Sequence, residues 1–216
     1  MTSTLLAKSA AATGAIGGIA GGAYLIKSHL FSGQESIRSK LEKEGWVLLS
    51  HEGKESEWTT ICGKYKKKET KDPSKLDETV TKNEADNSGI PKLKRSCELA
   101  LSKEFSESLY KSIIRWCVTP VSVEERLKYL GNYTKINVED SDATTDNDIW
   151  QTREATFKSD LTKNNQYLGV DLPSTPDNKA ENIKKLKTGC RNHLGRKNYE
   201  DEFESSIEKV KDWCGK

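Results

Sequence analysis

Residues 36–117 and 122–214 carry the same pattern of rare residues, which suggests two copies of one module. The matching positions, first copy and then second, are Ser36 and Ser122, Leu41 and Leu127, Gly45 and Gly131, Trp58 and Trp150, Cys97 and Cys190, Trp116 and Trp213, and Cys117 and Cys214. The offset grows from 86 to 97 along the chain, as small loop insertions in the second copy would produce. Four of the five Trp and four of the five Cys fall into these pairs. The sequence therefore predicts a tandem repeat.

Apolar residues spaced by three and four positions predict that both copies are helical. The clearest stripe occurs twice, at Ile90, Leu93, Cys97 and Leu101 and again at Ile183, Leu186, Cys190 and Leu194. This spacing is typical of one buried face of a helix. Each copy contains about four such short stretches, so we expect a mainly α fold. Residues 33–119 would form the first helical module and residues 120–216 the second, after an N-terminal segment of residues 1–32.

Capping residues predict where several of these helices begin and end. Ser122 and Glu125 have the spacing of a capping box, and Gly131 is placed to end that helix. Residues 174–176, Ser-Thr-Pro, offer a cap and a first-turn proline for the stripe of the second copy. The stretch Trp58–Tyr65 also has helical spacing, although its β-branched and aromatic residues permit a strand.

Two polar segments of unequal length interrupt the copies. They span about residues 71–89 in the first copy and 164–176 in the second. Polar connecting segments are the usual sites of mobility and of binding. We therefore expect these two loops to be mobile or to contact a partner.

The N-terminal segment has the composition of a membrane span. Residues 9–26 contain no charged side chain, and Leu5 and Leu6 extend the apolar stretch. A helix of this length would rise about 27 Å, just enough for a hydrocarbon core of about 30 Å. Residues 5–26 therefore predict membrane association, as an uncleaved single-pass anchor, a cleaved signal peptide or a re-entrant hairpin. The alternative is a flexible soluble tail, because so many glycines disfavour a helix in water.

Glycines in this segment have the spacing that lets two membrane helices approach closely. The candidate packing positions are Gly14, Gly17, Gly18, Gly21 and Gly22. Overlapping small-xxx-small spacings of this kind favour helix pairing, so a homodimer through the membrane segment is expected.

The flanks of the apolar segment predict opposite orientations. Positive charges follow it at Lys27, Arg38, Lys40 and Lys43, and the positive-inside rule would then keep the rest of the chain in the cytoplasm. The signal-like position at the N-terminus favours export instead. We expect the bulk of the chain to be extracellular.

The recurring cysteines form one pair per copy. These are Cys97 with Cys117 and Cys190 with Cys214, whereas Cys62 has no counterpart. A helical hairpin between the members of each pair would allow a disulfide, as small exported domains often contain. The alternative is buried free cysteine, which the position on the apolar stripe also fits.

The sequence lacks the patterns that define common catalytic, cofactor and metal sites. It contains no CxxC, HExxH, nucleophile elbow or phosphate-binding loop. A formal charge of +2 gives no strong field for nucleic acid. We predict no enzyme activity, no cofactor, no metal ligand and no nucleic-acid partner. His29, His51 and His193 do not recur and are expected to face solvent, while the four recurring tryptophans are expected to fill the module cores.

The layout resembles the uncharacterised paralogous membrane-anchored proteins of haemotropic mycoplasmas. The residues that carry this resemblance are the apolar stretch Ala10–Ile26 and the dipeptides Trp116-Cys117 and Trp213-Cys214, in a chain of similar size rich in Lys, Glu and Ser. The resemblance implies a wall-less, host-associated bacterium and a multicopy family displayed on the cell surface. It brings no catalytic residues with it.

Three functional hypotheses follow from the sequence. The first is a membrane-anchored surface protein that binds a host component or serves as an antigen, with loops 71–89 and 164–176 facing the partner. The second is a scaffold that faces the cytoplasm and organises a membrane complex. The third, least favoured, is a hydrolase with an unrecognised site.

Overall fold

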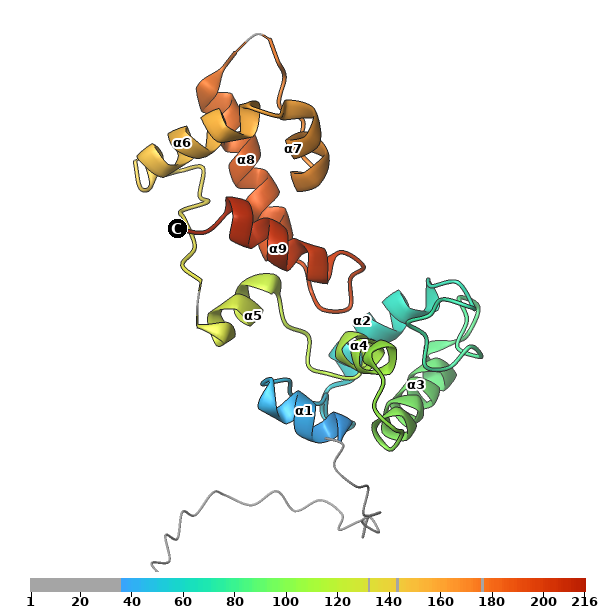
Figure 1. Ribbon diagram of the computed structural model, residues 1–216. Coiled ribbons are helices and arrows are strands. Elements are labelled where there is room, and N and C mark those ends of the chain that lie inside the picture. Colours follow the sequence, from blue (N-terminus) through green and yellow to red (C-terminus); the bar gives the residue numbers. More distant parts are fainter. Residues whose placement is uncertain (1–35, 132, 143, 176) are drawn as a thin grey trace, which may run out of the picture. The chain divides into compact units, whose positions relative to one another are not determined.

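The chain forms helices wherever apolar residues recur at three- and four-residue spacing. The computed structural model describes residues 36–131, 133–142, 144–175 and 177–216, and within these ranges it contains nine helices and no β-strand (Figure 1). The prediction of a mainly helical fold is confirmed. The apolar segment and its glycines lie outside the described residues. In the part of the chain that is described, no helix combines the length and apolarity needed to cross a membrane.

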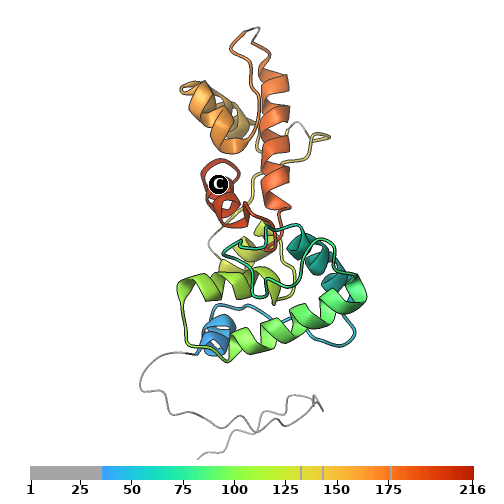
Figure 2. The same ribbon diagram turned by 90° about the vertical axis from the view of Figure 1, so that its right-hand side faces the viewer.

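Residues 36–119, which we call the first half, contain four helices. These are α1 (Ile37–Lys43), α2 (Glu55–Lys66), α3 (Asp86–Leu101) and α4 (Glu107–Trp116). The Ser36 hydroxyl caps α1 by accepting from the Ser39 amide, and Ser106 caps α4 in the same way. α3 packs against α2 and α4 (Figure 2). The stretch Trp58–Tyr65 lies in α2, so its helical interpretation is confirmed.

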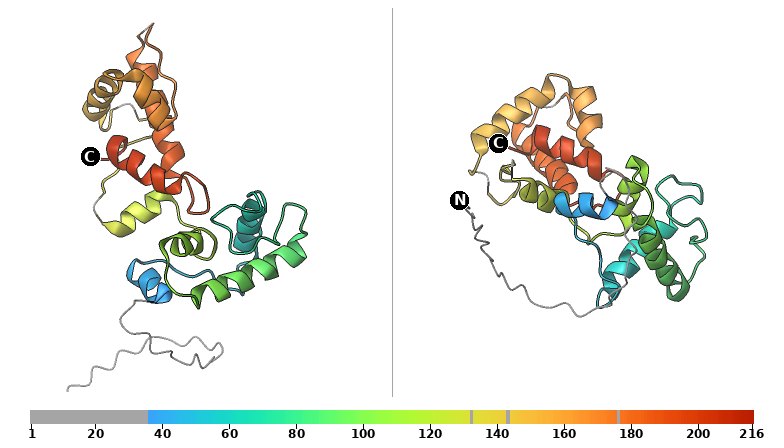
Figure 3. Two further views of the ribbon diagram at one scale, coloured as in Figure 1. Left: turned by 45° about the vertical axis from the view of Figure 1, so that its right-hand side comes forward. Right: turned by 60° about the horizontal axis from the view of Figure 1, so that its bottom comes forward.

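Residues 120–216, the second half, contain five helices. These are α5 (Val123–Leu130), α6 (Asn147–Lys158), α7 (Leu161–Leu168), α8 (Lys179–Leu194) and α9 (Phe203–Trp213). The capping box is confirmed: the Ser122 hydroxyl accepts from the Glu125 amide at 3.1 Å, and the Glu125 carboxylate accepts from the Ser122 amide at 2.5 Å. Gly131 ends α5 with a left-handed φ of 73°. α8, orange in Figure 3, lies against the red α9 in both views and also contacts α6.

Each half ties the segment after its first helix to the residues after its last helix. The Leu49 amide donates to the Cys117 carbonyl at 2.9 Å, and the Ile136 amide donates to the Cys214 carbonyl at 3.0 Å. An isolated antiparallel bridge flanks each bond, joining Leu48 to Val118 and Lys135 to Gly215. Both contacts therefore occur twice. On the C-terminal side their spacing from the recurring Trp-Cys dipeptides is the same, whereas Leu49 lies 9 residues before Trp58 and Ile136 lies 14 before Trp150.

Aromatic contacts recur in the same positions. The indole N–H of Trp58 donates to the Ser50 carbonyl at 2.7 Å, and that of Trp150 donates to the Asn137 carbonyl at 2.7 Å. Two edge-to-face pairs also match. They are Tyr65 with Trp116, at 5.0 Å between ring centroids, and Phe157 with Trp213, at 4.9 Å. We call the duplicated hydrogen bonds, bridges, aromatic contacts and cysteine pairs the frame.

Three expectations about helix position are corrected by the structure. The second polar loop is not a loop throughout, because its first part belongs to α7. The cap of α8 is not in residues 174–176: the Asn178 side chain accepts from the Glu181 amide and the helix starts at Lys179. The end of the first polar loop is likewise helical, since α3 begins at Asp86.

Residues Gln34–Lys216 form one compact unit, because the two halves contact each other closely. Between the halves, the Arg126 guanidinium of α5 donates to the Glu44 carbonyl at 2.6 Å. Within the second half, Ser122 and Lys197 form an antiparallel bridge that places the start of α5 beside the loop before α9. The Asn198 side chain also joins the halves, since its amide donates to the Ile114 carbonyl of α4 at 2.7 Å and its side-chain oxygen accepts from the Val121 amide at 2.9 Å. The boundary between modules at residues 119 and 120 remains a prediction.

Candidate functional site

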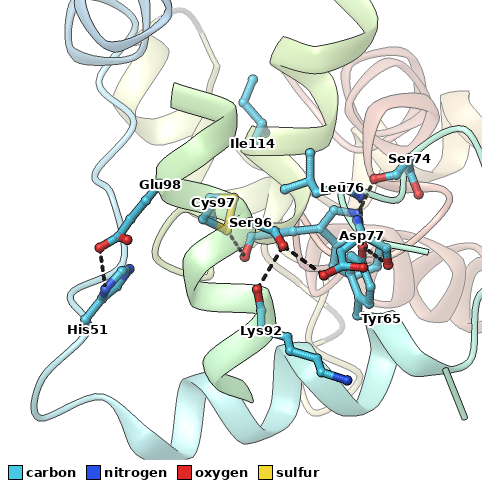
Figure 4. The surroundings of a disulfide bond; sticks show 12 residues. His51, Tyr65, Ser74, Leu76, Asp77, Lys92, Ser96, Cys97, Glu98 and Ile114 are labelled. Carbon is cyan, nitrogen blue, oxygen red and sulfur yellow. Dashed lines mark hydrogen bonds and ion pairs between the residues drawn. A yellow bond between two sulfur atoms is a disulfide. The ribbon is translucent and has the colours of Figure 1, made fainter. Parts of the chain in front are cut away.

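A disulfide lies at the centre of the first half. Cys97 of α3 is bonded to Cys117, the residue that caps the end of α4, with 5.6 Å between their Cα atoms. Figure 4 shows its surroundings, in which Ser96 lies between Lys92 and Asp77. The Ser96 hydroxyl is 2.8 Å from the Lys92 carbonyl and 3.4 Å from the Asp77 carboxylate. The disulfide thus lies beside the segment between α2 and α3, which we call the first cover segment (residues 67–85).

The first cover segment is fixed to the frame by two aromatic side chains. The Tyr65 hydroxyl accepts from the amides of Leu76 and Asp77 at 2.8 and 2.7 Å and donates to the Asp77 carbonyl at 3.0 Å (Figure 4). Burial raises the pKa of Tyr65 to about 12. The indole N–H of Trp116 donates to the Ser74 carbonyl at 2.8 Å. Loop 71–89 was expected to be mobile or to contact a partner. These bonds oppose mobility, so contact with a partner is the hypothesis that remains for this loop.

The second half has the equivalent disulfide but a different cover. Cys190 of α8 is bonded to Cys214 at the end of α9, with 5.7 Å between Cα atoms. Phe157 replaces the tyrosine, so no hydroxyl is present to hold a loop. The second cover segment, residues 159–175, instead contains α7, which begins at the cap Asp160 and ends at Gly169 with φ 67°.

A buried histidine fixes α7 to the second half. His193 is 4% exposed, with Nε2 3.0 Å from the Leu168 carbonyl and Nδ1 2.8 Å from the Ser206 hydroxyl. Because a carbonyl can only accept, Nε2 carries the proton and Nδ1 accepts from Ser206. Burial lowers the pKa of His193 below its ordinary value. The expectation that His193 faces solvent is therefore wrong.

The distance between His193 and Ser206 suits a nucleophile and its base, but their surroundings do not suit that role. Ser206 has no solvent exposure, and the second imidazole nitrogen meets a carbonyl rather than an orienting carboxylate. The pair therefore has a structural explanation in the attachment of α7. His51 is partly exposed and lies 3.2 Å from Glu98, while His29 lies outside the described residues.

The junction between the halves is polar and its charges are internally paired. Asp201 forms ion pairs with both Lys68 and Arg115, which brings the basic run after α2 against the loop before α9. These two cations lower the pKa of Asp201. Cavities of about 280 and 330 Å³ adjoin this cluster and are both lined by Arg115 and Asp201. Two further cations of the second cavity are paired, Lys64 with Glu200 and Arg196 with Glu202.

Trp46 and Arg126 form the other side of the junction. The guanidinium of Arg126 lies 4.1 Å from the Trp46 ring centroid and donates to the Glu44 carbonyl at 2.6 Å. Phe203 lies 6.4 Å from Trp46, measured between ring centroids. Sequence reasoning missed this cluster, although Trp46 is the one tryptophan without a partner in the repeat. That exception was the available signal.

The other site expectations have varied outcomes. Trp58, Trp116 and Trp150 are buried as expected, whereas Trp213 remains partly exposed. Cys62 is free and fully buried in α2. Among the described residues, no group of three or more His, Cys, Asp or Glu side chains is arranged to hold a metal ion.

Comparisons of this sequence and structure with protein-family models, curated proteins and solved structures find no match. Its function must therefore be inferred from its own residues.

Proposed function

We propose that this chain is a non-enzymatic, membrane-anchored surface protein whose two tandem helical modules bind a host or membrane partner or are displayed as an antigen. The anchor would be residues 5–26, and the modules would be residues 33–119 and 120–216. The observation that carries this proposal is the pair of disulfides at matching positions in the two halves.

Disulfides persist in oxidising compartments and are rare where thiols are kept reduced. Both bonds close short loops, with sequence separations of 20 and 24 residues, and both join a core helix to the end of the last helix. A module of about 90 residues has a small core, so a covalent link of this kind adds substantially to its stability. The cysteine pairs therefore support an exported location for the folded part.

The duplicated frame supports the tandem-module part of the proposal. Hydrogen bonds to the Cys117 and Cys214 carbonyls, indole bonds from Trp58 and Trp150, and the two edge-to-face aromatic pairs would be an improbable coincidence in unrelated halves. The segments placed over this frame differ between the halves. A constant frame with divergent covers is typical of proteins that vary their binding surface.

Protease treatment of intact cells tests the location. We expect residues 36–216 to be cut from outside, and peptide maps without reduction to contain Cys97 linked to Cys117 and Cys190 linked to Cys214. A cytoplasmic protein of the same cells, left uncut, is the control for intact membranes. If the chain is cut only after lysis and its cysteines are alkylated as free thiols, export is excluded.

That opposite outcome would favour a scaffold facing the cytoplasm. The positive charges at Lys27, Arg38, Lys40 and Lys43 are the observation in its favour. Its partner would then be a membrane complex rather than a host component.

Binding to the partner is tested by replacing part of each cover segment. Replacing residues 71–85 with a Gly/Ser-rich loop of equal length should abolish binding to host cells if that surface makes the contact. Replacing residues 170–175 provides the matched variant in the second half. Binding that survives both replacements, in variants with intact disulfides, would assign the contact to another surface.

A further inference from the structure

The last tryptophan of the frame differs between the halves in its burial and in its hydrogen bonding. Trp116 is fully buried and its indole N–H donates to Ser74 in the first cover segment. Trp213 occupies the matching position but is only partly buried. Among the described residues its indole N–H has no acceptor. The different path of the second cover segment therefore leaves an aromatic donor accessible.

Trp213 lines a pocket of about 440 Å³ formed by α6, α7 and α9. Its other lining residues include Arg153, Lys163, Asn164, Tyr167 and Asp212. The volume lies within the range of small-molecule sites. At the position of Arg153 the first half has Ile61, which is fully buried.

The two cations of this pocket lack carboxylate partners within the described part of the chain. Lys163 is exposed on α7 and its ammonium makes no ion pair there. Arg153 donates to the Gly215 carbonyl at 2.9 Å but contacts no carboxylate. Asp212 accepts from the Tyr167 hydroxyl at 2.8 Å. The pocket therefore presents two cationic donors and one indole N–H, and its one carboxylate, Asp212, accepts from Tyr167 and pairs with neither cation.

We propose that this pocket binds a small acidic sugar, a pyranose ring that carries a carboxylate. The carboxylate would accept charge-assisted hydrogen bonds from Lys163 and Arg153. The ring would pack its C–H groups against Trp213 and Tyr167, whose side chains combine an apolar body with a polar tip. A neutral sugar would leave the two cations without a partner. An inorganic anion would make no packing contact with Trp213 and Tyr167.

This inference deepens the proposed binding role by naming a ligand class, and it rests on that role. Its test uses the purified full chain in detergent micelles with its disulfides intact. Failure to bind the sugar would leave the cell-surface and disulfide experiments unaffected, so the two proposals can fail separately.

The indole ¹⁵N–¹H signals of the five tryptophans provide the readout. Trp213→Phe identifies the signal of Trp213 by its loss. Titration with glucuronate should then shift this signal saturably, while the signals of Trp58 and Trp116, buried in the first half, stay in place. Glucose, which has the ring without the carboxylate, should bind at least about tenfold more weakly, since charged hydrogen bonds are worth about 1.5–3 kcal/mol.

Two lysine variants separate site binding from general charge attraction. Lys163→Ala should weaken glucuronate binding by about tenfold, and Lys103→Ala, an exposed lysine in the first half, should leave it unchanged. Three results would overturn the proposal. They are an unmoved Trp213 signal, equal glucuronate affinity in the Lys163→Ala variant, or sulfate that binds as tightly as glucuronate.

Discussion

The first and second halves share a frame but hold their cover segments by different chemistry. In the first half the Tyr65 hydroxyl receives two backbone amides of an irregular loop. In the second half Phe157 has no hydroxyl, and His193 holds the end of α7 through the Leu168 carbonyl. The frame is fixed by covalent and backbone bonds that tolerate little change. The cover segments are held by side-chain hydrogen bonds that differ between the halves, so their paths can diverge.

The divergence extends to one pair of contacting residues, which differs between the halves. Cys62 of α2 is packed close to Gly89 of α3 in the first half. At the matching positions of the second half, the buried Glu154 accepts from the Asn182 side chain at 2.9 Å. A buried carboxylate needs a hydrogen-bond donor, whereas a thiol needs only space. Each half thus has its own self-consistent contact between equivalent helices.

The largest expected effect is loss of either disulfide. Replacing Cys97 and Cys117 by Ala, or Cys190 and Cys214 by Ala, should each lower the free energy of unfolding by about 3 kcal/mol, because the closed loops have similar lengths. Urea unfolding followed by circular dichroism measures this loss. Cys62→Ala, which breaks no disulfide, is the control. A much larger loss for one pair than for the other would show that the frame does not support both halves equally.

A glycine in α8 offers the next test, because its counterpart in the first half is a serine. A side chain at Gly189 would meet Val170 of the second cover segment at 2.6 Å, whereas Ser96 at the matching position lies beside Asp77. Gly189→Ser should therefore cost about 1–3 kcal/mol of stability through overpacking. Thermal unfolding measures the loss, and Ser96→Gly is the reciprocal variant. Wild-type stability of Gly189→Ser would mean that the second cover does not pack on α8 as described.

Removal of one hydroxyl should loosen the first cover alone. Tyr65→Phe makes the first half resemble the second, and it leaves the amides of Leu76 and Asp77 without their acceptor. The cost should be about 1–3 kcal/mol, because buried unpaired donors carry a desolvation penalty. Hydrogen exchange should accelerate at these two amides and remain unchanged in α7. Unchanged protection at Leu76 and Asp77 would contradict the role assigned to Tyr65.

The sequence predicted the frame better than the covers, for physical reasons. Apolar periodicity and recurring Trp and Cys report buried helix faces, and these faces set where the helices lie. α7 escaped prediction because Asn164, Asn165 and Gln166 look like a polar loop, although Asp160 and Gly169 were available as end signals. The burial of His193 could not be predicted, since its partners come from α7 and α9 and meet only in the folded chain.

The smallest expected effect is a pH dependence confined to the second half. Burial lowers the pKa of His193 in the folded protein. The hydrogen bond to the Leu168 carbonyl opposes this shift, Lys209 and Arg196 add to it, and Glu202 opposes it. In the unfolded chain the imidazole has its ordinary pKa of 6.5 and therefore binds a proton more readily. The stability contributed by neutral His193 is lost as the pH falls below about 6.5.

Wild type should lose more stability than His193→Gln between pH 7.5 and pH 5, measured by urea unfolding. Hydrogen exchange at pH 5 should locate the loss in α9, because protonated Nδ1 can no longer accept from Ser206 whereas Nε2 still donates to the Leu168 carbonyl. An equal loss in wild type and variant would mean that the bond between His193 and Ser206 contributes no pH-dependent stability.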